Sequence, residues 1–177
     1  VKDAQQPDRI VIGFDDEIAK RIMHELYTKH NCPKLECSPR TAEFIKYASN
    51  SFLATKISFV NEMANMCNSW GIDFKEVAEG MGLDSRISPL FLRAGAGFGG
   101  SCFPKDTRAI VTLAKKFRTN LSIVNSVIKS NENRSKILLN RILKILKNKI
   151  KNKQITFLGT TFKANTDDMS ESTCISL

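Results

Sequence analysis

The sequence Gly95-Ala-Gly-Phe-Gly-Gly-Ser-Cys-Phe-Pro-Lys-Asp106 decides how the middle of this chain folds. Its four glycines lie within six residues and predict a loop whose backbone can approach another group with no Cβ in between. Pro104 is favoured at the first position of a helix, and the apolar spacing that follows predicts a helix over 105–117. The stretch therefore predicts a glycine loop that carries Cys102 to the beginning of a helix.

Cys102 has two interpretations. The unpaired N–H groups at a helix N-terminus and the neighbouring Lys105 both favour the thiolate, which is the nucleophilic form of cysteine. A free cysteine is also commonly a small buried side chain with a packing role. The spacing alone leaves both interpretations open.

A family resemblance begins at this loop. Gly-Phe-Gly-Gly-Ser-Cys-Phe-Pro-Lys-Asp (97–106) resembles the nucleophile loop of the UDP-glucose/GDP-mannose dehydrogenase family. Three further blocks resemble that family in the same order: residues 7–13 the end of its nucleotide-binding domain, 41–62 its central helix, and 162–172 the opening of its UDP-binding domain. Four blocks in the right order cover nearly the whole chain.

The resemblance implies a mainly α fold, in which a central all-helical dimerisation domain lies between remnants of two Rossmann-like α/β domains. The expected domains are the end of an NAD-binding domain (1–37), the helical domain with the nucleophile loop (38–130), a linking basic helix (131–153) and the start of a UDP-binding domain (154–177). Apolar periodicity and turn residues predict strands at 9–12 and 154–158, helices at 15–29, 41–69 and 73–79, and a loop at 31–38.

Composition indicates a globular chain. It has 177 residues, 42% of them hydrophobic, and no apolar run approaches the length that spans a bilayer. The first residue is Val1 rather than Met, so we expect a chain cut from a longer protein. Five cysteines at irregular spacings argue against a disulfide framework and favour a cytoplasmic location.

The net charge of +9 is concentrated in one segment. Residues 129–153 hold nine Lys or Arg residues and one Glu, which accounts for +8 of the total. An apolar stripe at helical spacing runs through the same residues, so the segment is predicted to be an amphipathic helix with a basic face. Because no aromatic residue lies between Phe117 and Phe157, a solvated face is favoured over a nucleic-acid site.

Lys46 and Asn50 stand at i and i+4 on the predicted long helix, so their ammonium and amide reach the same region. The spacing alone is ordinary for a helix surface. The resemblance matches both residues to the family's catalytic Lys and Asn and implies that they stabilise oxyanions. Asp106 matches a carboxylate that orients water near a thioester, although a carboxylate in the first helical turn also suits the helix dipole.

The resemblance also implies a set of binding residues. The expected sugar-nucleotide contacts are Phe91, Leu92, Arg93, Ala94, Gly95, Gly99 and Lys163, with Arg86 reaching the site of a partner subunit and Lys105 lying near NAD. Two positions depart from the family pattern: Ser170 stands where an arginine usually contacts NAD, and Ala164 replaces a frequent Pro. Because no Gly-x-Gly-x-x-Gly follows a strand, we expect the isolated chain to bind no NAD and to be inactive.

The activity that the resemblance implies is the NAD-dependent four-electron oxidation of UDP-glucose to UDP-glucuronate through a thiohemiacetal and a thioester on Cys102. GDP-mannose is the alternative substrate. A rival from another class is a non-catalytic helical interaction module, which requires no special role for Cys102.

The apolar residues of the predicted long helix favour a homodimer. Phe52, Phe59, Trp70 and the methionines supply more apolar surface than one small helical domain can bury. No membrane partner is expected. A metal site is not expected either, because the spacing of His24, His30, Cys32 and Cys37 fits no standard zinc pattern.

Overall fold

A computed structural model describes residues 5–177, which form two compact units divided between residues 49 and 50. The expected NAD-domain remnant starts at Val1, and its residues 1–4 lie outside the described residues. The boundary falls within α3 (Pro39–Trp70), so the first turns of this helix belong to the first unit and the remainder to the second.

The first unit contains a parallel β-α-β arrangement. Strand β1 (Ile10–Gly13) pairs with β2 (Lys34–Cys37), with Ile10 opposite Lys34, and α2 (Glu17–Tyr27) connects them. Asp16 caps α2 by accepting a hydrogen bond of 2.8 Å from the backbone N–H of Ala19. The loop predicted over 31–38 is therefore wrong over 34–37, which form β2. Lys-Leu-Glu-Cys alternates polar and apolar residues, but the run is only four residues long and lies between Pro33 and Pro39, which favoured a loop. Strand β2 exists because its backbone pairs with β1.

In the second unit, one side of α3 carries mostly small buried side chains and the other side carries large exposed ones. Its buried residues there are Ser51, Ala54, Ser58, Val60, Asn61 and Cys67. Phe52, Phe59, Met66 and Trp70 are 46–68% exposed. The helix ends where Gly71 adopts a φ of +72°, a conformation that glycine reaches at little cost. One side of α3 thus admits close neighbours, and the other side has an exposed apolar surface.

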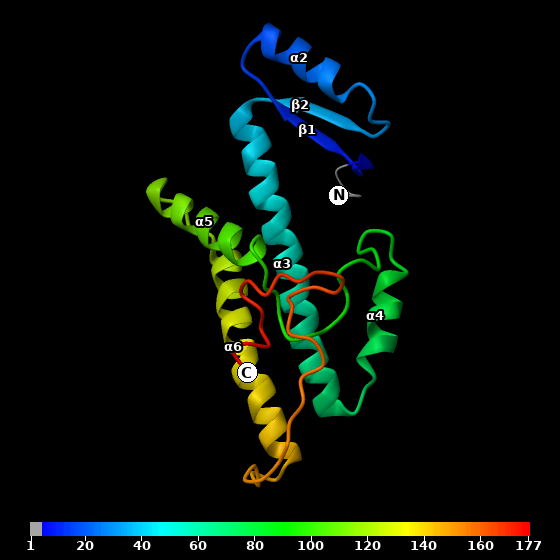
Figure 1. Ribbon diagram of the computed structural model, residues 1–177, viewed down its shortest axis with the longest axis vertical. Coiled ribbons are helices and arrows are strands. Elements are labelled where there is room, and N and C mark those ends of the chain that lie inside the picture. Colours follow the sequence, from blue (N-terminus) through cyan, green and yellow to red (C-terminus); the bar gives the residue numbers. More distant parts are fainter. Residues whose placement is uncertain (1–4) are drawn as a thin grey trace. The chain divides into compact units, whose positions relative to one another are not determined.

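Three further helices complete the second unit: α4 (Phe74–Gly82), α5 (Phe103–Lys116) and α6 (Ser122–Ile145). Asp73 caps α4 as expected, accepting from the N–H of Lys75 at 2.9 Å. Helices α3 and α6 run in the same direction (Figure 1), and they are joined by hydrogen bonds from Ser130 to Glu62 and from Arg134 to Asn65. The glycine loop lies next to both helices.

A small apolar core lies where α3, the glycine loop and α6 meet. Ala54 of α3, Phe98 of the loop and Val127 of α6 are buried together, and Ile57 and Phe103 pack against them. Because Ala54 has only a methyl group, the ring of Phe98 can pack close to the helix. This core fixes the base of the loop that ends at Cys102.

The end of the basic segment differs from its prediction. Helix α6 stops at Ile145, because Lys147 and Asn148 adopt φ angles of +50° and +57° and the N–H of Asn148 closes the helix on Leu143 O at 2.9 Å. The helix expected to reach residue 153 is therefore wrong over its last turns.

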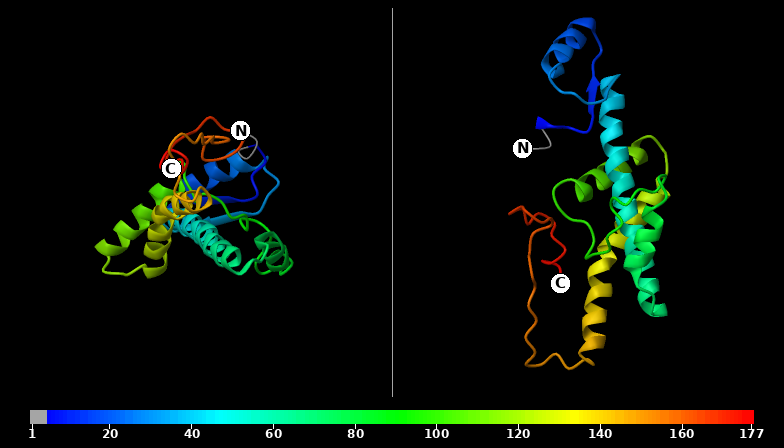
Figure 2. Two further views of the ribbon diagram at one scale, coloured as in Figure 1. Left: turned by 90° about the horizontal axis from the view of Figure 1, so that it is seen from below. Right: turned by 90° about the vertical axis from the view of Figure 1, so that its right-hand side faces the viewer.

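The strand expected at 154–158 is also wrong, because this segment has no neighbouring strand to pair with among the described residues. After α6 the chain turns back and returns to the glycine loop (Figure 2, orange to red).

The prediction of a mainly α fold with a helical central part is confirmed. None of the helices within residues 5–177 is both long and apolar enough to cross a membrane.

Candidate active site

Cys102 occupies the N-cap position of α5, at the exit of the glycine loop. Its side chain is exposed, and its Sγ lies 3.8 Å from the hydroxyl oxygen of Ser101. Pro104 stands in the first turn of α5, where its missing N–H costs no helical hydrogen bond. The interpretation of Cys102 as a buried packing residue is therefore wrong, and its thiol is open to a reactant.

Asn50 and Asp106 come together between α3 and α5. The amide Nδ2 of Asn50 donates to Oδ2 of Asp106 at 2.7 Å, and Asp106 is only 1% exposed. The ammonium of Lys105 lies 3.4 Å from the other carboxylate oxygen, Oδ1. A buried carboxylate requires such donors, since burial removes its water. Because Asp106 lies one helical turn after Cys102, this carboxylate belongs to the same helix end as the thiol.

Lys46 lies one turn before Asn50 on α3, as the spacing predicted. It belongs to the first unit, whereas Asn50, Cys102 and Asp106 belong to the second. Its catalytic role stays a prediction.

Side chains from α3 and α6 hold the first half of the glycine loop, at Gly95 and Phe98. Asn61 accepts from the N–H of Gly95 at 2.8 Å, and Arg134 Nε donates to Gly95 O at 2.9 Å. Asn131 bonds both backbone groups of Phe98, accepting from its N–H at 2.8 Å and donating to its C=O at 2.9 Å. These bonds satisfy backbone groups that a partly buried loop would otherwise leave unpaired.

The sequence prediction missed Asn61, Asn131 and Arg134 as supports of the loop. Arg134 lies in the basic segment expected to be solvated, yet it is 6% exposed, and burial together with nearby Arg141 lowers the pKa of its guanidinium. Lys129, Lys136 and Lys144 of the same helix are exposed, as expected. The available signal was asparagine within helices, because asparagine lowers helix stability unless its side chain has a specific partner.

The segment before the loop is held in an unusual backbone conformation. The Lys56 ammonium donates to Ile87 O at 2.9 Å and to Leu90 O at 2.6 Å. Phe91 follows with a φ of +63°, an uncommon conformation for a bulky residue that is often found at functional sites. The ring of Phe103 meets Phe91 edge to face at 6.4 Å and Phe98 at 6.0 Å. The expected substrate segment is thus packed against the first residue of α5.

The other expected substrate residues fall into two groups. Phe91, Arg93, Ala94 and Gly95 are exposed. Residues 92–94 line a cavity of about 450 Å³ beside α4. Leu92 is 4% exposed and packs against Gly82, so its side chain supports the segment. Gly99 is buried, and a Cβ there would lie 2.2 Å from Glu171 O, so this glycine makes room for the chain itself.

Arg86 and Lys163 are exposed. The guanidinium of Arg86 donates to Asp84 with two nitrogens, at 3.0 Å and 2.7 Å, and this side-chain hydrogen bond lowers the pKa of Asp84 from its ordinary value. The reach of Arg86 to a partner subunit therefore stays a prediction, and it would require leaving Asp84.

The described residues fit a nicotinamide dinucleotide at one point only. Lys105 has a side chain that is 68% exposed beside Cys102, and its cation would suit the anionic part of NAD. Gly95, Gly97 and Gly100 have the spacing of a dinucleotide fingerprint, but they follow no strand, and the amides of Gly95 and Gly100 already bond protein groups. The glycine loop is therefore not a dinucleotide-binding turn.

Comparisons with known proteins identify relatives over the whole chain. The sequence model of the UDP-glucose/GDP-mannose dehydrogenase family, central domain, matches residues 40–133. A UDP-glucose 6-dehydrogenase of Rickettsia bellii is 44% identical over 100% of this chain, and one of Bacillus subtilis is 47% identical over 99%. The chain spans 42% and 40% of the length of these two proteins.

Solved structures give the same picture. A UDP-glucose dehydrogenase from the archaeon Pyrobaculum islandicum matches 99% of this chain with a TM-score of 0.94 and 40% identity, over 40% of its own length. A UDP-D-ManNAc dehydrogenase from Pyrococcus horikoshii matches 94% of this chain with a TM-score of 0.81 and 26% identity, again over 40% of its length.

Proposed function

The chain belongs to the UDP-glucose/GDP-mannose dehydrogenase family, and on this premise we propose that its full-length protein oxidises UDP-glucose to UDP-glucuronate, with Cys102 as the nucleophile. The observation that supports this most strongly is local. An exposed thiol stands at the N-terminus of α5, one turn from a buried carboxylate that is held by Asn50.

The carbon that reacts is C6 of the sugar, which goes from alcohol to carboxylate with the loss of four electrons. NAD⁺, when bound, accepts one hydride in each of two successive oxidations, and Lys105 is the residue of this chain that would contact it. Between the oxidations the sulfur of Cys102 bonds to the aldehyde carbon, and the carbonyl electron pair moves to oxygen to give a thiohemiacetal. The second oxidation leaves a thioester on Cys102.

Release of the product requires water. Water adds to the thioester carbon, the carbon–sulfur bond breaks, and the electron pair returns to Cys102 as the thiolate. Asp106 would accept the proton of this water. The amide of Asn50 has two N–H groups, so it can bond Asp106 and still offer a donor to the oxyanion, and Lys46 would offer a second.

UDP-glucose is the favoured substrate because the relatives carry that name. Proteins named UDP-glucose 6-dehydrogenase are 44% and 47% identical to this chain, and the UDP-glucose dehydrogenase structure matches with a TM-score of 0.94. GDP-mannose stays the alternative within the family.

The test is an assay of the full-length protein with each sugar nucleotide. We expect two NADH per UDP-glucuronate formed and a much higher kcat/KM for UDP-glucose than for GDP-mannose. A preference for GDP-mannose would overturn the substrate, and the absence of NADH with every sugar nucleotide would overturn the activity.

We also propose that α3 forms a two-fold interface with a second copy of the protein. Phe52, Phe59 and Met66 recur every seven residues and are 66%, 47% and 46% exposed. This spacing places them along one line of the helix, which is how helices pair through an apolar seam. Trp70 extends the line and is 68% exposed.

A further inference from the structure

We propose that Arg108 and Glu171 are positioning residues for the nucleophile, because their ion pair holds residues 160–176 against the loop that carries Cys102. We call residues 160–176 the strap. The predicted change in kcat rests on the proposed function. The predicted change in the position of the glycine loop does not, because it can be measured without turnover.

The strap lies directly against the glycine loop. The N–H of Gly100, two residues before Cys102, donates to Ser170 O at 2.7 Å. A Cβ on Gly100 would lie 2.7 Å from the ring of Phe162, and one on Gly99 would lie 2.2 Å from Glu171 O. Gly99 and Gly100 therefore have no side chain where the strap packs against the loop. The position of the strap fixes the position of these two glycines.

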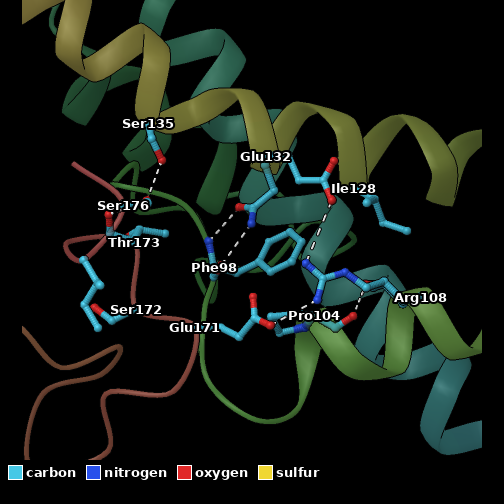
Figure 3. A pocket seen from close by; sticks show the side chains of 13 residues that line it. Phe98, Pro104, Arg108, Ile128, Glu132, Ser135, Glu171, Ser172, Thr173 and Ser176 are labelled. Carbon is cyan, nitrogen blue, oxygen red and sulfur yellow. Dashed lines mark hydrogen bonds and ion pairs between the residues drawn. The ribbon is translucent and has the colours of Figure 1, made fainter.

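Arg108 connects the strap to the nucleophile helix. It extends from the second turn of α5, and its Nη1 lies 3.1 Å from Oε1 of Glu171, while its Nη2 lies 3.9 Å from Oε1 of Glu132 on α6 (Figure 3). One guanidinium thus joins α5, α6 and the strap. Because Glu171 follows Ser170 directly, fixing its side chain also fixes the carbonyl that bonds Gly100.

Empty space surrounds this ion pair. One cavity of about 410 Å³ and another of about 390 Å³ are both lined by Pro104, Arg108 and Glu171. The side chains of Arg108 and Glu171 therefore have open space beside them, whereas the strap backbone packs closely on Gly99 and Gly100. The hydrogen bond to Gly100 and the ion pair are the polar contacts that tie the strap to the loop and to α5 here. Glu171 keeps a φ of +49°, which a non-glycine residue adopts only when its surroundings hold it.

Hydrogen bonds within the strap hold its residues in fixed positions relative to one another. Ser172 is 5% exposed and donates to Thr160 O at 2.6 Å, and Phe162 N–H donates to Asp168 O at 3.2 Å. Asp168 accepts from the N–H of Ser170 at 2.8 Å, and the Ser170 hydroxyl lowers the pKa of that carboxyl. These bonds fold the strap on itself, so one point of attachment orients the whole segment.

The ion pair is exposed, with half of each side chain open to solvent, so its removal should alter geometry rather than unfold the protein. We expect Arg108→Ala and Glu171→Ala, each in the full-length protein, to raise hydrogen exchange at the Gly100 amide roughly threefold, since the partner carbonyl is no longer fixed. Exchange at the Phe98 amide, which Asn131 holds, should not change.

Turnover gives the second measurement. Each single variant should lower kcat for UDP-glucose roughly tenfold. This is less than the roughly hundredfold loss expected when a reacting group is misplaced by about 1 Å. KM should stay within about twofold of the wild-type value. Arg108→Ala combined with Glu171→Ala should be no slower than either alone, because both remove the same interaction. Arg108→Lys should recover part of the loss. Ser135→Ala is the matched control, because Ser135 bonds Ser176 at the other end of the strap, and it should behave as wild type.

Unchanged Gly100 exchange in both single variants would overturn the proposal, as would losses in kcat that multiply in the double variant. If the wild-type protein oxidises no sugar nucleotide, the proposed function fails. A comparison of the hydrogen-exchange rates of the Gly100 and Phe98 amides then still tests the positioning role of Arg108 and Glu171.

Discussion

At the scale of single residues, Asp106 is the group whose surroundings matter most. Its carboxylate is buried beside a thiol that is open to solvent, and Asn50 donates to it at 2.7 Å. The side chain of Asn50 thus has a structural task in addition to its proposed catalytic one. A buried acceptor that loses its donor costs more than the hydrogen bond itself was worth.

We therefore expect Asn50→Ala to lower the free energy of unfolding by about 1–3 kcal/mol. Asn50→Asp should cost more, because a second carboxyl group would then face Asp106 in place of the amide that donates to it. Urea unfolding measures both. Asn120→Ala, at an exposed asparagine between α5 and α6, is the control and should change little. A loss in Asn50→Asp that is no larger than in Asn50→Ala would contradict this account of Asp106.

At the scale of elements, the glycine loop is the part that depends most on its neighbours. Asn131 closes on both backbone groups of Phe98, and Phe98 in turn packs on Ala54. Hydrogen bonds from α6 and packing against α3 thus fix the loop. Together they determine where Cys102 lies.

Asn131→Ala should cost about 2 kcal/mol of stability, since two hydrogen bonds to backbone groups are lost at roughly 1 kcal/mol each. Exchange of the Phe98 amide should rise strongly in the same variant. Asn133→Ala tests a neighbouring exposed asparagine on α6 and should leave both quantities unchanged. Phe98 exchange that stays at its wild-type rate would show that packing alone holds the loop.

The same elements show how far the sequence predicts this structure. The loop, the two helices around it and the i, i+4 spacing of Lys46 and Asn50 follow from glycine, proline and apolar periodicity, which are local signals. The supports of the loop do not, because Asn131 and Arg134 act on backbone groups far away in sequence. Strand β2 was missed for a similar reason, since it depends on pairing with β1.

At the scale of the whole molecule, the exposed apolar line of α3 is the feature that the described residues leave uncovered. Phe52→Glu with Phe59→Glu should shift the full-length protein from dimer to monomer in sedimentation, because charges on the seam would be buried without partners. Phe117→Glu is the control, since Phe117 is 73% exposed at the end of α5. A wild-type protein that sediments as a folded monomer at micromolar concentration would contradict the proposed interface.

The central claim is that Cys102 bonds covalently to the substrate. The most direct measurement is the mass of the peptide that contains Cys102, after the full-length protein is acid-quenched during a single turnover of UDP-glucose with NAD⁺. We expect a UDP-sugar acyl group on Cys102 that appears and decays with product formation, and no such group in Cys102→Ser, which should bind UDP-glucose but form no UDP-glucuronate. Product formation with Cys102 unmodified throughout, or near-normal turnover by Cys102→Ser, would contradict the account.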